Sequence, residues 1–121
     1  MPRIQRTPRK LPVVPEIPFA SAIEAWFWYV RAERLRFAGA KLGGPTPSFQ
    51  RPCEPDDINR AVMGLYRGGA LTKEHLKILA TFGWADRVPD PRVGAEVTPA
   101  KLWGEALDKL HVSLKEKGIV E

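Results

Sequence analysis

Four aromatic residues follow one another at positions 26–29 of this chain, in the order Trp-Phe-Trp-Tyr. They lie in a segment with helical composition, and successive residues of an α-helix point about 100° apart. Four aromatic residues in a row therefore reach every side of the helix. A helix on a protein surface normally keeps a polar stripe. This one must be surrounded, either by the rest of its own chain or by a partner.

The size and composition of the chain fit a single globular domain with a flexible end. It has 121 residues, of which 44% are apolar, and its one cysteine, Cys53, excludes an internal disulfide. No run approaches the roughly 20 apolar residues of a membrane span. Four prolines between residues 8 and 18 interrupt the segment in which a signal peptide would be apolar. We therefore expect a cytoplasmic protein outside the membrane.

The net charge of +5 is concentrated at one end of the chain. Residues 1–15 carry Arg3, Arg6, Arg9 and Lys10 and no acidic residue, while the remainder of the chain is close to neutral. Nucleic-acid affinity depends largely on cations that neutralise phosphates. The overall charge thus overstates the case for nucleic-acid binding by the folded part.

Prolines also define the organisation of the chain, because residues 1–18 contain five of them. Proline fixes φ and removes a backbone donor, so this segment cannot be a helix. We predict an extended basic arm over residues 1–18 and one helical domain over residues 19–121. The arm is either a solubilising tail or a ligand for an anionic surface or a partner groove.

Capping signals and apolar spacing predict four helices. The first covers residues 21–38, where Ser21 and Glu24 fit a capping box. The second covers residues 56–67, after Pro55. The third follows Thr72 and ends near Phe82, with Gly83 as the residue that stops it. The fourth begins with Thr98 as N-cap and continues to about residue 117, before Gly118.

The apolar positions of these helices predict one common core. On the first helix the spacing favours a buried face of Ile23, Phe27, Val30, Arg34 and Phe37. The strongest core candidates of the whole chain are Trp26, Phe27, Leu65, Leu76, Leu79, Trp103, Leu107 and Leu110. The fold class is therefore all-α, with four main helices around one core, a helix-turn-helix-like centre and the extended arm.

The helix-turn-helix likeness comes from the second and third predicted helices. Two short helices joined by a glycine-containing turn are the outline of that motif, although the turn here is about two residues too long. A plain helical hairpin is the alternative. If the unit contacts DNA, the candidates are Lys73, Lys77 and Thr81 at the groove, with phosphate contacts from Arg60, Arg67, Arg3, Arg6, Arg9 and Lys10.

The aromatic helix offers a different interface. Tryptophan, tyrosine and arginine are enriched where proteins bind one another. Trp26, Trp28 and Tyr29 are therefore candidates for contact with a protein partner or a second copy of the chain. The alternative is that the helix is simply a central packing element.

No catalytic or metal-binding pattern is present in the sequence. His75, His111 and Cys53 do not have the spacing of metal ligands, and we expect the two histidines to be solvated or locally hydrogen-bonded. The glycine pairs at residues 43–44 and 68–69 do not match a phosphate-binding loop. We expect no cofactor, no metal and no enzymatic activity.

Several short segments of the C-terminal half resemble small bacterial proteins of no known activity. They are Leu65-Tyr66-Arg67, His75-Leu76, Phe82-Gly83, Pro89-Asp90-Pro91-Arg92, Leu102-Trp103, Glu105-Ala106-Leu107 and Lys117-Gly118-Ile119-Val120. The resemblance implies a bacterial, cytoplasmic setting and carries no functional residue.

Together these patterns favour a non-enzymatic regulatory or adaptor protein that binds duplex DNA through its helix-turn-helix-like unit. The alternative is a protein–protein interaction module, or a homodimer, that uses the first helix and binds no nucleic acid. Neither hypothesis involves a membrane or a metal.

Overall fold

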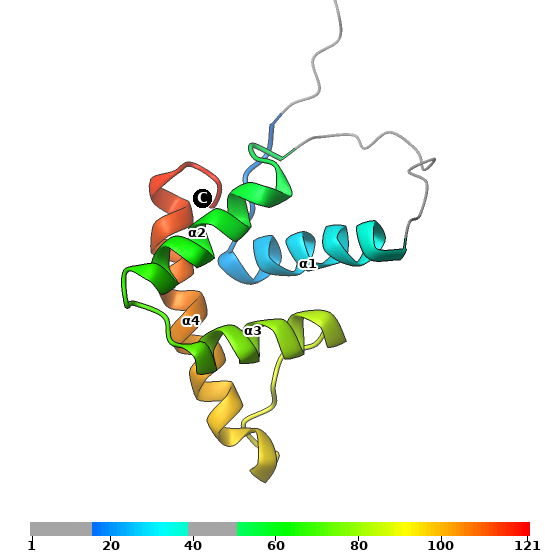
Figure 1. Cartoon of the computed structure of the whole chain (residues 1–121), viewed down its shortest axis with the longest axis vertical. Coiled ribbons are helices and arrows are strands. Elements are labelled where there is room, and N and C mark those ends of the chain that lie inside the picture. Colours follow the sequence, from blue (N-terminus) through cyan, green and yellow to red (C-terminus); the bar gives the residue numbers. More distant parts are fainter. Residues whose placement is uncertain (1–15, 39–50) are drawn as a thin grey trace, which may run out of the picture.

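The computed structural model describes residues 16–38 and 51–121. These residues form four α-helices, α1 (Ala22–Ala38), α2 (Pro55–Arg67), α3 (Lys73–Ala85) and α4 (Val97–Glu116), with a 3-10 turn, η1 (Gly94–Glu96), before α4. Figure 1 shows α1 between α2 and α3, with α4 packed along all three. The predicted all-α class with four main helices is confirmed. Most of the predicted arm, including Arg3, Arg6, Arg9 and Lys10, lies outside the described residues.

The core lies where the four helices meet, and it includes segments from both ends of the described chain. Its largest fully buried side chains are Phe19, Ile58, Leu71, Leu79, Leu110 and Leu114. Five of the predicted core residues are buried, namely Trp26, Leu79, Trp103, Leu107 and Leu110. The other three, Phe27, Leu65 and Leu76, are half-buried against the core.

The start of α1 follows the predicted capping pattern with one change. The backbone N–H of Glu24 donates to Oγ of Ser21 at 3.4 Å. The Glu24 carboxylate in turn accepts a hydrogen bond from the N–H of Ala20 at 2.8 Å, one residue earlier than a capping box requires. The helix nevertheless begins where the sequence predicted.

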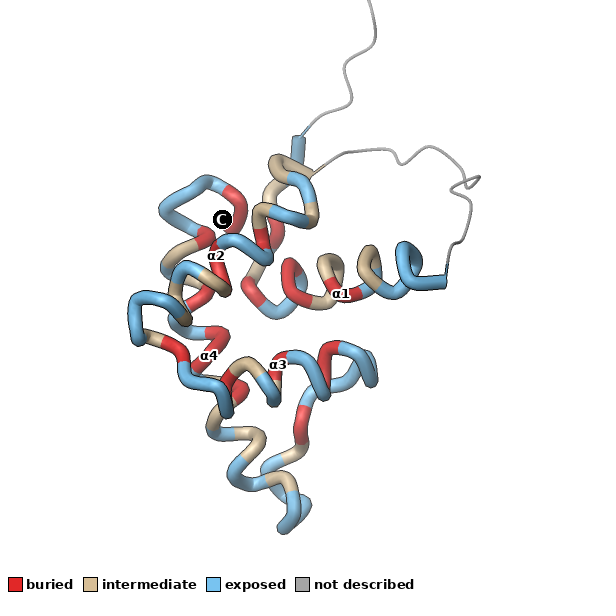
Figure 2. The backbone as a smooth tube through the Cα atoms, viewed as in Figure 1, coloured by how far each residue is buried: buried red, intermediate tan, exposed pale blue. Residues whose placement is uncertain are grey.

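The buried face of α1 differs from the predicted one. Ala22, Ala25, Trp26 and Val30 are buried, whereas Phe37 of the predicted face is 83% exposed. Because aromatic residues occur on every side of this helix, no polar stripe marks its solvent side, and the apolar spacing alone did not fix its rotation. Figure 2 shows that burial is confined to the first half of α1 and that its last turns are exposed.

The predicted end of α3 at Phe82 is wrong, because the helix continues to Ala85. Gly83 is buried inside the helix, and the helix ends at Asp86, whose φ of 60° and ψ of 40° are left-handed. The reason lies in packing. A Cβ at Gly83 would stand 2.7 Å from Nε1 of Trp26, so this glycine allows α1 and α3 to approach rather than stopping α3.

The predicted start of α4 is also slightly wrong. Thr98 is not the N-cap, since the helix begins at Val97 and Glu96 takes the capping position. The Glu96 carboxylate instead accepts hydrogen bonds from Arg87 and from the backbone N–H of Asp90. These bonds connect the beginning and the middle of the segment between α3 and α4 to its end. At the other end, Gly118 has a φ of +78° and terminates the helix as predicted.

The two ends of the described chain meet in one short parallel bridge between Phe19 and Val120. The N–H of Phe19 donates to the carbonyl of Ile119 at 2.9 Å, and its carbonyl accepts from the N–H of Glu121 at 3.0 Å. The Phe19 ring is fully buried, and the guanidinium of Arg51 lies 4.1 Å from its centroid. Both ends are thereby part of the core.

Candidate nucleic-acid and protein interfaces

The predicted DNA-contacting residues of α3 share one exposed side of the helix. Lys73, Lys77 and Thr81 are four residues apart and all exposed, and neither lysine makes an ion pair with the described residues. The opposite side of α3 buries His75, Leu79 and Phe82. The amphipathic pattern of the helix thus leaves a free polar stripe, although Glu74 is exposed beside it.

The first turn of α3 is fixed by a reciprocal contact between Thr72 and His75. The N–H of His75 donates to Oγ1 of Thr72 at 3.3 Å, and the N–H of Thr72 donates to Nδ1 of His75 at 3.0 Å. Histidine therefore takes the place of the acid in a capping box. Because Nδ1 accepts, the proton of the neutral ring is on Nε2. His75 is locally hydrogen-bonded, as one of the sequence alternatives proposed.

His75 also connects α3 to α4. Its Nε2 donates to Oε1 of Glu105 at 3.0 Å, and this hydrogen bond lowers the pKa of the Glu105 carboxyl, with smaller contributions from Lys101 and Lys109. Nζ of Lys109 donates to the carbonyl of Ala70 at 2.7 Å, in the turn before α3. Two lysines of α4 therefore lie near the start of α3. Sequence reasoning did not identify these lysines as candidates. Each is four residues from Glu105, a spacing that places all three on one side of a helix.

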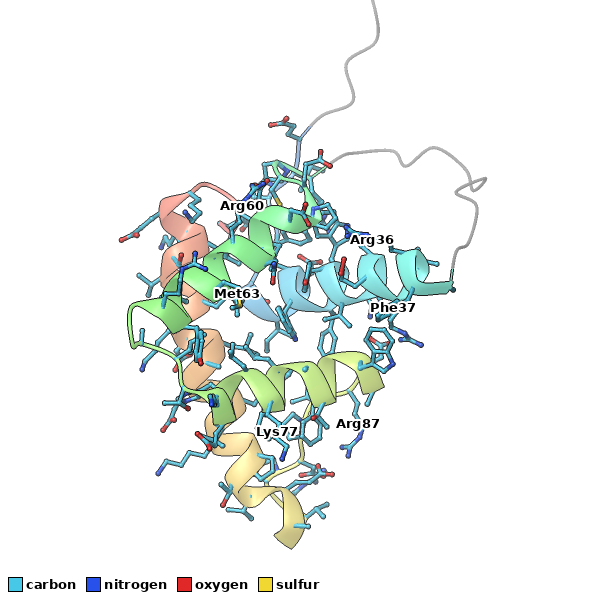
Figure 3. The ribbon with its side chains drawn as sticks, in the orientation of Figure 1. Arg36, Phe37, Arg60, Met63, Lys77 and Arg87 are labelled. Atoms are coloured by element: carbon cyan, nitrogen blue, oxygen red, sulfur yellow. The ribbon has the colours of Figure 1, made fainter. Side chains whose placement is uncertain are left out.

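The two predicted phosphate contacts of α2 have different surroundings. Arg60 is paired with Asp57 at 2.9 Å, whereas Arg67 is exposed at the end of the helix. In Figure 3, Arg60 lies by α2 and Lys77 by α3, with α1 between the two helices. The structure therefore does not bring Arg60 together with the α3 lysines.

The packing of α2 and α3 departs from a helix-turn-helix unit. The two helices are joined by residues 68–72, but the principal packing partners of each are α1 and α4. In a helix-turn-helix the two helices pack closely on each other across the turn. The long turn seen in the sequence corresponds to this wider separation. The contacts of α4 position the exposed side of α3.

The four consecutive aromatic residues are surrounded mainly by their own chain. Trp26 is 6% exposed, and its Nε1 donates to the carbonyl of Leu79 at 3.0 Å. The Trp28 ring lies 5.1 Å from that of Phe19, between centroids, and the Phe27 ring 5.6 Å from that of Trp103. The chain segment leading into α1 and the other helices thus supply most of the surroundings that the sequence required.

Trp28 and Tyr29 are both half-buried, so each keeps part of its side chain exposed to solvent. Burial raises the pKa of the Tyr29 hydroxyl, and the nearby carboxylates of Glu33 and Asp56 add to this effect. Tyr29 therefore stays protonated at neutral pH. Of the three predicted partner-binding residues, Trp28 and Tyr29 retain surface for a contact, whereas Trp26 retains very little.

The described residues contain no cluster that suggests chemistry. Burial raises the pKa of the Cys53 thiol to about 11, with Asp57 and Glu54 adding to the shift, which makes it a poor nucleophile at neutral pH. No group of three metal-ligating side chains occurs within residues 16–38 and 51–121. None of the helices in the described part of the chain is long and apolar enough to cross a bilayer.

No protein family model, curated protein or solved structure matches this chain. The assignment of a function therefore depends on the surfaces themselves.

Proposed function

We propose that this protein is a non-enzymatic regulatory or adaptor protein of the bacterial cytoplasm that contacts duplex DNA through the exposed side of α3. The observation that carries the proposal is the stripe formed by Lys73, Lys77 and Thr81, whose lysines have no acidic partner among the described residues. Lys101 and Lys109 of α4 lie near the start of this stripe. Lys73, Lys101 and Lys109 therefore lie around the first turn of α3, and Lys77 follows one turn later.

Such an arrangement suits a phosphate backbone. Each lysine that neutralises a phosphate releases a condensed counterion, and this release supplies much of the affinity of proteins for DNA. Thr81 can donate to a phosphate or to a base edge. In this proposal Arg67 and the arm residues Arg3, Arg6, Arg9 and Lys10 add backbone contacts, and Arg60 does so after exchanging Asp57 for a phosphate.

The test measures how the affinity of the full chain for a 20-base-pair DNA duplex depends on salt. Fluorescence anisotropy gives this affinity at salt concentrations from low to physiological. Replacing Lys73 and Lys77 together by glutamine should reduce the slope of log K against log salt by about two, at roughly 0.9 for each lost contact. The matched control is the double replacement by glutamine of Lys115, in the last turn of α4, and Lys117, which caps the helix; both are exposed. That variant should keep the original slope.

A second variant separates the helices from the arm. Removal of residues 1–15 should weaken binding but leave part of it, still sensitive to Lys73 and Lys77. Absence of binding at low salt would overturn the proposal. Complete loss of binding on removal of the arm would show that the helical domain does not contact DNA.

A protein–protein module without a nucleic-acid role is the second candidate. It is favoured by the charge balance of the described residues, because the five cations outside them leave 14 basic and 14 acidic residues. The exposed parts of Trp28 and Tyr29 would form its contact surface, with Trp26 behind them. Sedimentation velocity over a wide concentration range tests self-association through α1, and a strict monomer would exclude the homodimer.

A further inference from the structure

The far end of α1 and the end of α3 enclose an open groove that neither hypothesis from the sequence used. Its volume is about 790 Å³, and it is lined by Arg31, Arg34, Leu35, Phe37 and Ala38 of α1 and by Trp84 of α3. We call it the aromatic–arginine groove. Figure 3 shows Phe37 at this end of α1, on the side that faces α3. Neither Trp28 nor Tyr29 is among the residues that line the groove.

The apolar side chains of the groove are unusually exposed and touch one another. Phe37 is 83% exposed, and Trp84 and Leu35 are each 47% exposed. The rings of Phe37 and Trp84 meet edge to face, with centroids 5.8 Å apart. Single exposed apolar residues are common, but a contiguous group around a hollow marks a site of interaction. Large aromatic side chains beside arginine are the residues that dominate binding at protein interfaces.

The two charged side chains that line the groove, Arg31 and Arg34, are both cationic. The guanidinium of Arg34 lies 5.9 Å from the Trp84 ring centroid, and Arg34 has no carboxylate partner among the described residues. Arg31, which also lines the groove, is paired with Asp86 at 3.0 Å, and Asp86 is not one of the lining residues. The groove therefore combines an apolar floor with one unneutralised cation, and its complement is an apolar segment that carries carboxylates.

We propose that the aromatic–arginine groove binds a short acidic segment of another protein, with one or two large apolar side chains against Leu35, Phe37 and Trp84 and a carboxylate on Arg34. This contact is independent of the proposed DNA contact of α3 and uses different residues. It is also distinct from self-association through Trp28 and Tyr29.

Two other occupants fit the groove less well. A nucleic-acid base cannot insert between Phe37 and Trp84, because the two rings are already in contact. A second copy of the chain docked symmetrically would bring a second set of α1 arginines to the same interface. Charge complementarity instead favours an acidic peptide.

The experiment is a selection of peptides from a displayed library of random 12-residue sequences, with the full-length protein as bait. The enriched peptides should be rich in aspartate or glutamate around one or two large apolar residues. Synthetic versions should bind the protein and lose at least about tenfold in affinity to the Phe37→Ser variant and to the Arg34→Glu variant. Because Phe37 and Arg34 are exposed, both variants should unfold at the temperature of the parent protein.

Matched controls distinguish the groove from the general surface. Val112→Ser removes an apolar side chain that is 58% exposed on α4, and Lys115→Glu reverses an exposed charge on the same helix. Both should bind the selected peptides as the parent does. The proposal is overturned if no peptide is enriched, if the peptides show no acidic bias, or if binding is indifferent to Phe37 and Arg34.

Two further results would replace the peptide with another occupant and so overturn the proposal. One is binding of single-stranded oligothymidylate that depends on Phe37 and Arg34. The other is dimerisation in sedimentation experiments that the Phe37→Ser variant abolishes.

Discussion

Trp26 of α1 lies so close to Gly83 of α3 that a methyl group at position 83 would stand 2.7 Å from the indole nitrogen. The same nitrogen donates to the carbonyl of Leu79, one helical turn before Gly83. The missing side chain and the hydrogen bond belong to one contact, in which the indole edge enters the space that a larger residue would fill. This contact fixes the distance between α1 and α3.

Replacement of Gly83 by alanine should therefore destabilise the protein, although alanine is the better helix former. We expect a loss of about 1–3 kcal/mol, as for other overpacked cores, measured by urea denaturation. Gly64 of α2 is the matched control, because no atom lies within 4 Å of its added Cβ. Gly64→Ala should stabilise the protein by roughly 0.5–1 kcal/mol. Equal effects at the two glycines would contradict this account of the contact.

Trp26 and Gly83 should also be energetically coupled. Trp26→Phe removes Nε1, the atom nearest to the added methyl group, together with the hydrogen bond to Leu79. The single substitution should cost about 2 kcal/mol or more from the lost bond and the cavity. In the Trp26→Phe background, Gly83→Ala should cost less than it does in the parent, by about 1 kcal/mol. Strict additivity in a double-mutant cycle would show that the two residues do not compete for one space.

Glu96 should make the stability of the segment between α3 and α4 sensitive to acid. Its hydrogen bond with Arg87, supported by the backbone N–H of Asp90, lowers the pKa of Glu96 to about 2, from a usual value near 4.5. A lowered pKa means that the stabilisation is complete above about pH 5 and is lost as the pH falls toward 2. Thermal unfolding of Glu96→Gln should occur at a lower temperature at pH 7, with a weaker dependence on pH below 5. Glu116→Gln, at an exposed position on α4, should retain the parent profile.

His75 should be a single tautomer in the native protein. The acceptor role of Nδ1 and the donor role of Nε2 require the proton to be on Nε2, which imidazole ¹⁵N chemical shifts report directly. His111, which has no such pair of partners among the described residues, is the internal reference. His75→Ala leaves the N–H of Thr72 and the carboxylate of Glu105 without this partner and should destabilise the protein by about 1–3 kcal/mol. A mixture of tautomers at His75 would contradict the capping geometry.

Cys53 should react slowly with alkylating reagents in the folded protein. With a pKa of about 11, only about one thiol in a thousand is ionised at pH 8. Iodoacetamide labelling followed by mass spectrometry should be much slower in buffer than in urea, where the burial that raises the pKa is lost. Rapid labelling of the folded protein would show that Cys53 is more accessible than the structure indicates.

The sequence was sufficient to predict the class and number of the helices because their ends carry strong local signals. Pro55 and Thr72 begin helices, and Gly118 ends one, through interactions within a few residues. The predicted core was correct for Leu79, Trp103 and Leu110 because long apolar stripes on α3 and α4 leave little freedom of rotation.

What the sequence could not specify depends on contacts between distant segments. The role of Gly83 follows from Trp26, and the tautomer of His75 follows partly from Glu105, thirty residues away. The rotation of α1 depends on the helices packed around it, which is why the helical spacing placed Phe37 on the inner face of α1. Phe37 is instead the most exposed of the large apolar residues that the structure describes. The aromatic–arginine groove exists only because α1 and α3 end side by side.

The bridge between Phe19 and Val120 holds the two ends of the described chain together. The helices could therefore keep their packing if the chain connected them in a different order. With both ends held together, a short glycine–serine linker from residue 121 to residue 16 would close the domain into a ring. The ring could be opened at Gly69, which is exposed in the turn before α3. A circular permutant of this kind would start with α3, finish with α2, and retain every helix–helix contact of the parent.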